Sequence, residues 1–267
     1  MENDKIEITK EEIQSWNVFF AIPCYNSVVT EPFFTSFLKT SIYLNSIGLN
    51  WTLCTIADSL INRARNNLIA KFLGNKECTH IMFIDSDIQF DHESIVKLLW
   101  HDKEIITGSY PIKEIDWKKV KELSVEDVAH EDLLSKSTKH VVHLAKENQT
   151  TVNVEKGAIE VFEAGTGFML IKREALEKMM EQYGEYKYLD DTGALSPDEI
   201  DYGYAFFNSY VDETGRFLSE DYGFCRYWQD ISGSIWVDPT ITLVHVGRIK
   251  YTGTMLSYLQ DISSNIE

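Results

Sequence analysis

The 267-residue sequence is poor in several kinds of residue, and each shortage excludes a class of protein. Five prolines and 14 glycines are too few for a collagen-like or low-complexity chain. No run approaches 18 consecutive apolar residues, and the segment MENDKIEITKEE at the start is too charged for a signal peptide. We therefore expect a cytoplasmic protein without stable membrane insertion.

Cysteine is also scarce. No two of the four cysteines form a C-x-x-C pair, so zinc-ribbon and thioredoxin-type sites have no support. We expect reduced, mostly buried thiols. The four residues are Cys24, Cys54, Cys78 and Cys225.

Basic residues are outnumbered by acidic ones. Lysine and arginine total 25 against 42 aspartates and glutamates, for a net charge of −17. Such a field repels nucleic acid and anionic lipid, so we expect no nucleic-acid partner. An anionic substrate would need local neutralisation by a metal ion or by a few placed cationic side chains.

The composition that remains is that of a packed globular protein, with 44% hydrophobic residues. The length favours a single domain over residues 1–267. Apolar runs alternate with helical patterns, which predicts an α/β fold with a mostly parallel central sheet flanked by helices and ligands at the carboxyl ends of its strands. The expected strands lie near 18–23, 51–57, 79–90, 104–111 and 234–247, and the expected helices near 31–47, 58–73, 91–100 and 219–228. A further strand followed by a helix is expected within 161–176.

Two segments depart from this alternation. Apolar density falls over 113–157, which we interpret as an exposed, partly helical insertion that closes like a lid over a ligand. The stretch 183–215 is irregular and rich in tyrosine and phenylalanine, which is typical either of an acceptor-binding loop or of packing.

The strongest chemical motif is a pair of acids at the end of an apolar strand. The period of two places Asp85 and Asp87 on the same side of the chain, where both can bind one Mg²⁺ or Mn²⁺ ion. The alternative is a polar strand end without a ligand. An EF-hand is excluded because Phe90 and Val96 occupy the positions that require Gly and Glu, and a dinucleotide-binding turn because Leu170 replaces the third glycine.

A second polar feature is a stripe on the helix expected at 58–73. Its one cation, Arg65, can reach a donor or Asp85, or else form an ion pair with Asp58, whereas Arg63 points elsewhere on the helical wheel. Lys113 is a further candidate cation. Two glycines, Gly165 and Gly167, allow close approach of a sugar to the backbone, or merely bend the strand.

Seven short motifs follow one another between about residues 17 and 250. They are IPCYN, INRARN, FIDSDIQF, SYPIK, GTGFMLIKR, SEDYGFCRYW and DPTITLVHVG. Together they resemble GT-A-fold glycosyltransferases, similar to the inverting family 2-like set and to uncharacterised phage and large-virus members. The resemblance implies an enzyme that uses Mn²⁺ or Mg²⁺ to move a sugar from a nucleotide-sugar donor, with UDP favoured over GDP, to the hydroxyl of a glycan or glycosylated acceptor. For a viral member, the location would be the host cytoplasm.

The resemblance also assigns roles to residues of this chain. Asp221 would be the catalytic base, while Glu220 serves the amino terminus of its helix. His245 would complete the metal site, unless it is a buried core histidine. The implied donor-binding residues are Pro23, Tyr25, Asn26, Asp58, Arg65, Asp85, Ser86, Lys113, Gly165 and Gly167, and the implied metal ligands are Asp85, Asp87 and His245. A nucleotidyltransferase of related fold and a carbohydrate-binding protein with a decayed transferase site remain the alternatives.

Overall fold

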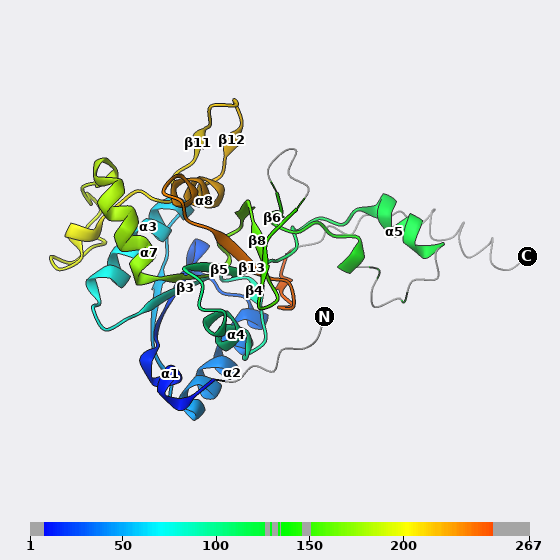
Figure 1. Ribbon diagram of the computed structural model, residues 1–267, viewed down its shortest axis with the longest axis horizontal. Coiled ribbons are helices and arrows are strands. Elements are labelled where there is room, and N and C mark those ends of the chain that lie inside the picture. Colours follow the sequence, from blue (N-terminus) through cyan, green and yellow to red (C-terminus); the bar gives the residue numbers. More distant parts are fainter. Residues whose placement is uncertain (1–7, 126–128, 130–132, 134, 146–150, 248–267) are drawn as a thin grey trace, which may run out of the picture.

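The computed structural model describes residues 8–125, 129, 133, 135–145 and 151–247. Its centre is an eight-stranded sheet in the order β2-β1-β3-β10-β5-β13-β8-β7 (Figure 1). Of these eight strands, β8 and β10 run against the direction shared by the other six. The expected α/β architecture with a mostly parallel sheet is confirmed. The strands are β1 (Asn17–Pro23), β2 (Asn50–Ile56), β3 (His80–Ile84), β5 (Ile105–Gly108), β7 (Val154–Glu155), β8 (Ala158–Val161), β10 (Phe168–Lys172) and β13 (Ile235–Asp238).

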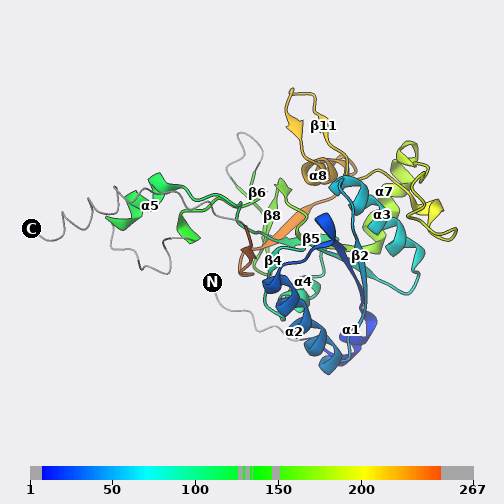
Figure 2. The same cartoon turned by 180° about the vertical axis from the view of Figure 1, so that it is seen from behind.

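Helices cover both faces of this sheet, which explains why its central strands are continuously apolar. On β1, Phe19 and Ala21 belong to one buried cluster, while Val18, Phe20 and Ile22 belong to the other. The alternation follows from the strand period of two. The first cluster is covered by α3 (Ile61–Gly74), α7 (Arg173–Gln182) and α8 (Glu220–Asp230), and the second by α2 (Glu31–Ile47) and α4 (Ser94–Trp100), with α1 (Lys10–Ser15) at its edge (Figures 1 and 2).

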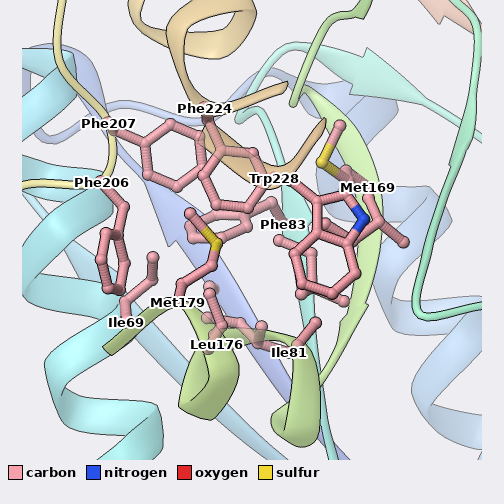
Figure 3. Packing of buried hydrophobic residues seen from close by; sticks show 14 of the residues in the cluster. Ile69, Ile81, Phe83, Met169, Leu176, Met179, Phe206, Phe207, Phe224 and Trp228 are labelled. Atoms are coloured by element: carbon pink, nitrogen blue, oxygen red, sulfur yellow. The ribbon is translucent and has the colours of Figure 1, made fainter. Parts of the chain in front are cut away.

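The aromatic stretch 183–215 contributes largely to packing. Phe206 and Phe207 are fully buried and join Phe224 and Trp228 of α8 in the first cluster (Figure 3). The rings of Phe207 and Phe224 stack with centroids 4.5 Å apart. These rings are therefore unavailable to an acceptor. The stretch also contains the short helices η2 (Gly184–Tyr186) and η3 (Ile200–Tyr202) and the strand β11 (Tyr210–Val211), which pairs with β12 (Phe217–Leu218).

Several element boundaries differ from the sequence expectation. Helix α3 begins at Ile61 rather than at Asp58, because the Asp58 carboxylate accepts a hydrogen bond from Leu60 N at 2.9 Å in a turn before the helix. The expected strand 234–247 is two strands, β13 and β14 (Val244–His245). Pro239 and the hydrogen bond from Thr240 N to Asp238 form the turn that separates them.

The apolar run 79–90 is also divided. Strand β3 ends at Ile84, before the two acids, and β4 (Ile88–Gln89) follows them and pairs with β14 rather than with the main sheet. The acids therefore occupy a turn between two sheets, and this turn lies at the carboxyl end of β3.

The insertion 113–157 is exposed and partly helical where it is described. Helix α5 (Trp117–Ser124) projects away from the main sheet in both views, and the Trp117 side chain is 70% exposed (Figures 1 and 2). At its base, β6 (Val142–His143) pairs with β9 (Glu163–Ala164). Residues 126–128, 130–132, 134 and 146–150 lie outside the described part, so the lid remains a prediction.

The expectations drawn from the few cysteines and from the lack of long apolar runs can be compared with the structure. All four cysteines are free; Cys24, Cys78 and Cys225 are buried and Cys54 is half-buried. Among the described residues, none of the helices combines the length and the apolar character needed to cross a bilayer.

Candidate functional site

A cavity of about 410 Å³ opens at the carboxyl ends of β1 and β3. Eight of the residues proposed from the sequence line it, although they come from five separate segments. The lining residues are Pro23, Cys24, Tyr25, Asp58, Ser59, Ile61, Ala64, Asp85, Ser86, Asp87, Lys113 and His245.

Asp87, Lys113 and His245 meet on one side of this cavity. The Lys113 ammonium donates a hydrogen bond to Asp87 Oδ2, and His245 Nε2 lies 3.4 Å from Asp87 Oδ1. The backbone supports this contact, since Val246 N donates to Asp87 O at 2.8 Å. Burial alone would raise the pKa of Asp87, but the hydrogen bond from Lys113 and the contact with the protonated form of His245 outweigh it and hold that pKa below its usual value.

The hydrogen bond on the other ring nitrogen of His245 fixes its tautomer. Nδ1 lies 2.9 Å from the carbonyl oxygen of Pro111, which can only accept, so Nδ1 carries a proton. In the neutral ring, Nε2 is then a lone-pair acceptor that faces the Asp87 carboxylate. Two facing acceptors need a proton or a cation beside them, and a histidine whose Nδ1–H binds a carbonyl is the usual form of a metal ligand.

Asp85 has a different partner. Arg65 is buried in α3, and its guanidinium lies 3.1 Å from Asp85 Oδ1 and 2.6 Å from Glu220 Oε1. Burial opposes the charge on Arg65, but the two carboxylates more than compensate and raise its pKa. Burial raises the pKa of Glu220. Arg65 therefore joins the turn after β3 to α8, behind the cavity wall to which Asp85 belongs.

Tyr110 connects this wall to the group formed by Asp87, Lys113 and His245. Its buried ring lies 5.2 Å from the His245 ring, and Gly167 N donates to its hydroxyl at 3.2 Å. Cβ atoms added at Gly165 and Gly167 would lie 2.4 Å and 2.8 Å from Tyr110 atoms, and the one at Gly167 would lie 2.6 Å from Asp85 Oδ2. The two glycines therefore admit the tyrosine and the aspartate.

Asp221 begins the helix next to this wall. Ser219 Oγ and Tyr222 N both donate to its Oδ1, which leaves Oδ2 outside those two contacts. The adjacent Glu220 also lies in the first turn of α8, as expected for an acid at a helix amino terminus. Its side chain in addition pairs with Arg65.

Other assignments from the sequence also change. Asp58 pairs with Arg63 at 2.6 Å and not with Arg65, because α3 begins only at Ile61 and turns Arg63 toward the preceding segment. Asn26 has a positive φ of 53° beside the cavity but does not line it.

The expected three-ligand metal site is not assembled. Among the residues that the structure describes, no group of three or more His, Cys, Asp and Glu side chains is arranged to hold a metal ion. Asp85 and Asp87 line one cavity, but the Asp85 carboxylate pairs with Arg65. Asp87 and His245 therefore remain as a two-residue set.

Sequence reasoning missed four residues of the cavity lining, Cys24, Ser59, Ile61 and Ala64. It also missed Tyr110, which packs against the His245 ring and accepts a hydrogen bond from Gly167 N. Tyr110 carried a signal, since an aromatic residue between a strand and Pro111 stands at the strand end where ligands bind. Cys24 and Ser59 had no comparable signal.

No protein-family model matches the chain, and no curated protein matches its sequence. Two solved structures are similar over most of its length. The protein A197 from STIV is 16% identical with a TM-score of 0.46, covering 89% of this chain and 100% of that one. GalNAc-T7 with UDP, GalNAc and Mn²⁺ is 11% identical with a TM-score of 0.40, covering 93% of this chain and 47% of that one. Likenesses this distant assign no activity to the chain.

Proposed function

We propose that the protein transfers a glycosyl group from a nucleoside-diphosphate sugar, with UDP favoured, to an acceptor hydroxyl. The observation that carries this proposal is the meeting of Asp87, His245 and Lys113 in one cavity at the carboxyl ends of the strands. A chain with a net charge of −17 needs such a group to hold a diphosphate.

The cavity lining offers groups that suit both parts of a nucleotide. Pro23, Tyr25 and Ile61 offer apolar and aromatic surface for a base, whereas Lys113 and His245 offer polar groups for phosphates. Asp85 and Gly167 would face the sugar, near Asp221. Moving Lys113 from Asp87 to a phosphate oxygen exchanges one ion pair for another.

Asp87 and His245 fit a divalent cation such as Mn²⁺ or Mg²⁺. Both atoms that face each other are acceptors, and the His245 tautomer is set by Pro111. Ions of this kind are bound by few protein ligands, with phosphates and water completing the shell. When bound, the cation would offset charge on the departing diphosphate.

The chemistry then requires a base for the acceptor. The acceptor oxygen forms a bond to the anomeric carbon, the bond from that carbon to the diphosphate oxygen breaks, and the nucleoside diphosphate leaves with the electron pair. The acceptor proton passes to Asp221. Asp221 suits this role because Glu220 is committed to Arg65, and a negative charge is favourable in the first turn of α8. Attack from the face opposite the diphosphate would invert the anomeric configuration.

The alternative functions are less well supported. A nucleotidyltransferase would need a glycine-rich, basic loop after its first strand, and Cys24–Thr30 contains neither a glycine nor a basic residue. A decayed carbohydrate-binding protein would not need a buried arginine to hold two acids at the cavity wall.

Release of nucleoside diphosphate tests the proposal. The protein is incubated with Mn²⁺ and a panel of UDP- and GDP-sugars, and the released diphosphate is measured. We expect release from at least one donor. Release from none, although the protein is folded, would contradict a transferase and favour a binding protein.

Substitution of the base tests the mechanism. Asp221→Asn keeps the shape of the side chain but removes its basicity, so turnover should fall roughly a hundredfold or more while donor binding changes little. Asp230→Asn, at the exposed carboxyl end of the same helix, is the matched control and should keep parental turnover. Near-parental turnover in Asp221→Asn, or a product of retained configuration, would exclude an inverting base at this position.

A further inference from the structure

A second polar cluster lies outside the cavity, around Glu163 of β9. The Glu163 side chain is completely buried, yet it accepts hydrogen bonds from three cationic or titratable side chains. Arg226 Nε contacts Oε1 at 3.0 Å, Arg216 Nη2 contacts Oε2 at 2.9 Å, and His143 Nδ1 contacts Oε2 at 2.6 Å.

The cluster is built from four separate parts of the fold. Glu163 belongs to β9, His143 to β6 and Arg226 to α8, while Arg216 directly precedes β12. Arg216 uses both terminal nitrogens on the carboxylate, with the Nη1 contact at 3.1 Å, which fixes the plane of its guanidinium. Figures 1 and 2 show the β11–β12 hairpin rising from α8, with β6 nearby at the base of the insertion.

One arginine would be enough to neutralise the buried carboxylate. Arg226 can do so alone, since it is the less exposed of the two arginines, at 23%, and its guanidinium stacks on the Phe162 ring at 3.8 Å. Arg216 and His143 are 37% and 48% exposed. Two guanidinium groups therefore contact one carboxylate, which leaves one positive charge that Glu163 does not neutralise, and Arg216 is the more exposed of the two arginines.

This positive surface lies beside the proposed catalytic base. Tyr222 follows Asp221 directly, and its ring lies 5.1 Å from the His143 ring and 5.4 Å from the Arg216 guanidinium. The chain also links the cluster to the glycine that admits Tyr110. Gly165, two residues beyond Glu163, donates its N–H to the carbonyl of Val141, two residues before His143, at 3.0 Å. Burial raises the pKa of Tyr222 to about 12, so its hydroxyl remains a neutral donor.

We propose that Arg216, His143 and Tyr222 form an acceptor subsite that recognises a sugar carrying a negatively charged group, either a carboxylate or a phosphate. The Arg216 guanidinium binds the anion, joined by the Nε2–H of His143 when that ring carries both protons, and the tyrosine ring offers a flat face to the sugar. Glu163 acts as a positioning residue that holds Arg216 and His143 from beneath. The inference rests on the proposed transferase function, because it takes the position of Asp221 as the site of acceptor activation.

Binding of simple sugars tests this subsite. Glucose 6-phosphate, glucuronate and glucose serve as probes in the presence of UDP and Mn²⁺, with affinities measured by calorimetry. We expect both anionic sugars to bind more tightly than glucose, and Arg216→Gln to weaken them roughly tenfold. Arg216→Lys should restore part of the loss. The control Lys187→Gln removes a positive charge from an exposed ion pair with Asp201 and should keep parental affinities.

Each outcome bears on the subsite separately from the transferase function. Equal affinity for the three sugars, binding of none of them, or an unchanged affinity in a folded Arg216→Gln protein would overturn the subsite. Diphosphate release from nucleotide sugars is measured on the same samples without acceptor. If diphosphate is released but anionic sugars bind no better than glucose, only the subsite is excluded. If anionic sugars bind in a way that depends on Arg216 but no diphosphate is released, the subsite is retained and the transferase function is excluded.

Discussion

Two aspartates that lie two residues apart, Asp85 and Asp87, have opposite surroundings. Asp85 faces Arg65, whose side chain is only 4% exposed and also binds Glu220. Asp87 faces Lys113, which is 41% exposed and lies on the loop that leads into the insertion. Both acids are neutralised, but one partner is fixed in the core and the other borders solvent.

This difference gives the two ion pairs different roles: the pair of Asp85 is structural, whereas Asp87 can exchange its partner. Removing a buried partner leaves a charge without solvation, so the Arg65 contacts must persist while the protein is folded. An exposed lysine pair contributes little to stability and can exchange its partner at small cost. We infer that Asp85 shapes the cavity wall and that Asp87 is the acid available to a cation.

The largest expected effect comes from the buried arginine. Arg65→Met leaves Asp85 and Glu220 without their shared partner, and should lower the free energy of unfolding by about 3–5 kcal/mol. Arg63→Met is the matched control two residues away on α3, where the ion pair with Asp58 is half-exposed and should contribute less than about 1 kcal/mol. Urea denaturation measures both. Equal losses in the two variants would contradict the distinction between fixed and exchangeable pairs.

A glycine substitution disturbs Asp85 without touching Asp87. In Gly167→Ala the added methyl would lie 2.6 Å from Asp85 Oδ2 and 2.8 Å from Tyr110. Overpacking of this kind should cost about 1–3 kcal/mol of unfolding free energy. Gly184→Ala, where no atom lies within 4 Å of the added Cβ, is the control. Mn²⁺ affinity should remain parental in both variants, and a large loss in Gly167→Ala would show that Asp85 is itself a ligand.

Removal of the exposed lysine should have opposite effects in two conditions. Without nucleotide, Lys113→Met frees Asp87, so Mn²⁺ should bind more tightly. We expect a gain of about fivefold, which corresponds to the free energy of one exposed ion pair. With UDP present, the same variant should bind the nucleotide more weakly, because a cation beside the diphosphate is lost. Paramagnetic resonance of free Mn²⁺ measures the first affinity and calorimetry the second. Lys178→Met is the control; the same sign of change in both conditions would exclude the exchange.

The smallest expected effect is a difference between Glu220 and Asp87 in how their contributions to stability depend on pH. The pKa of Glu220 is raised above 4.5, so the folded state binds more protons and stability falls as pH rises through that value. The pKa of Asp87 is lowered below 3.8, so its stabilising contribution is present above 3.8 and is lost as pH falls. Relative to the parent, Glu220→Gln should gain stability as pH rises above 4.5, and Asp87→Asn should gain it as pH falls below 3.8. Denaturation without metal, as a function of pH, should show changes of under about 1 kcal/mol, and slopes of the same sign would contradict the assignment.

The sequence by itself determined the layered fold. Continuous apolar runs require a sheet covered on both faces, and helix 31–47 has the predicted bounds because Thr30 caps its start and Gly48, with φ of 78°, ends it. The polar stripe on α3 and the acids after β3 predicted the end of the sheet at which the cavity lies, because the carboxyl ends of parallel strands meet there.

The partner of each charged group was decided only by the tertiary structure. Arg65 lies 20 residues from Asp85 and 155 from Glu220, and the Pro111 carbonyl that sets the His245 tautomer is 134 residues away from it. No local period relates such positions. The sequence analysis did not single out Glu163, because its role depends on partners contributed by β6, α8 and the β11–β12 hairpin. Local periodicity decides which face a side chain occupies, whereas the partner of a charge depends on which segments the packing of the core brings together.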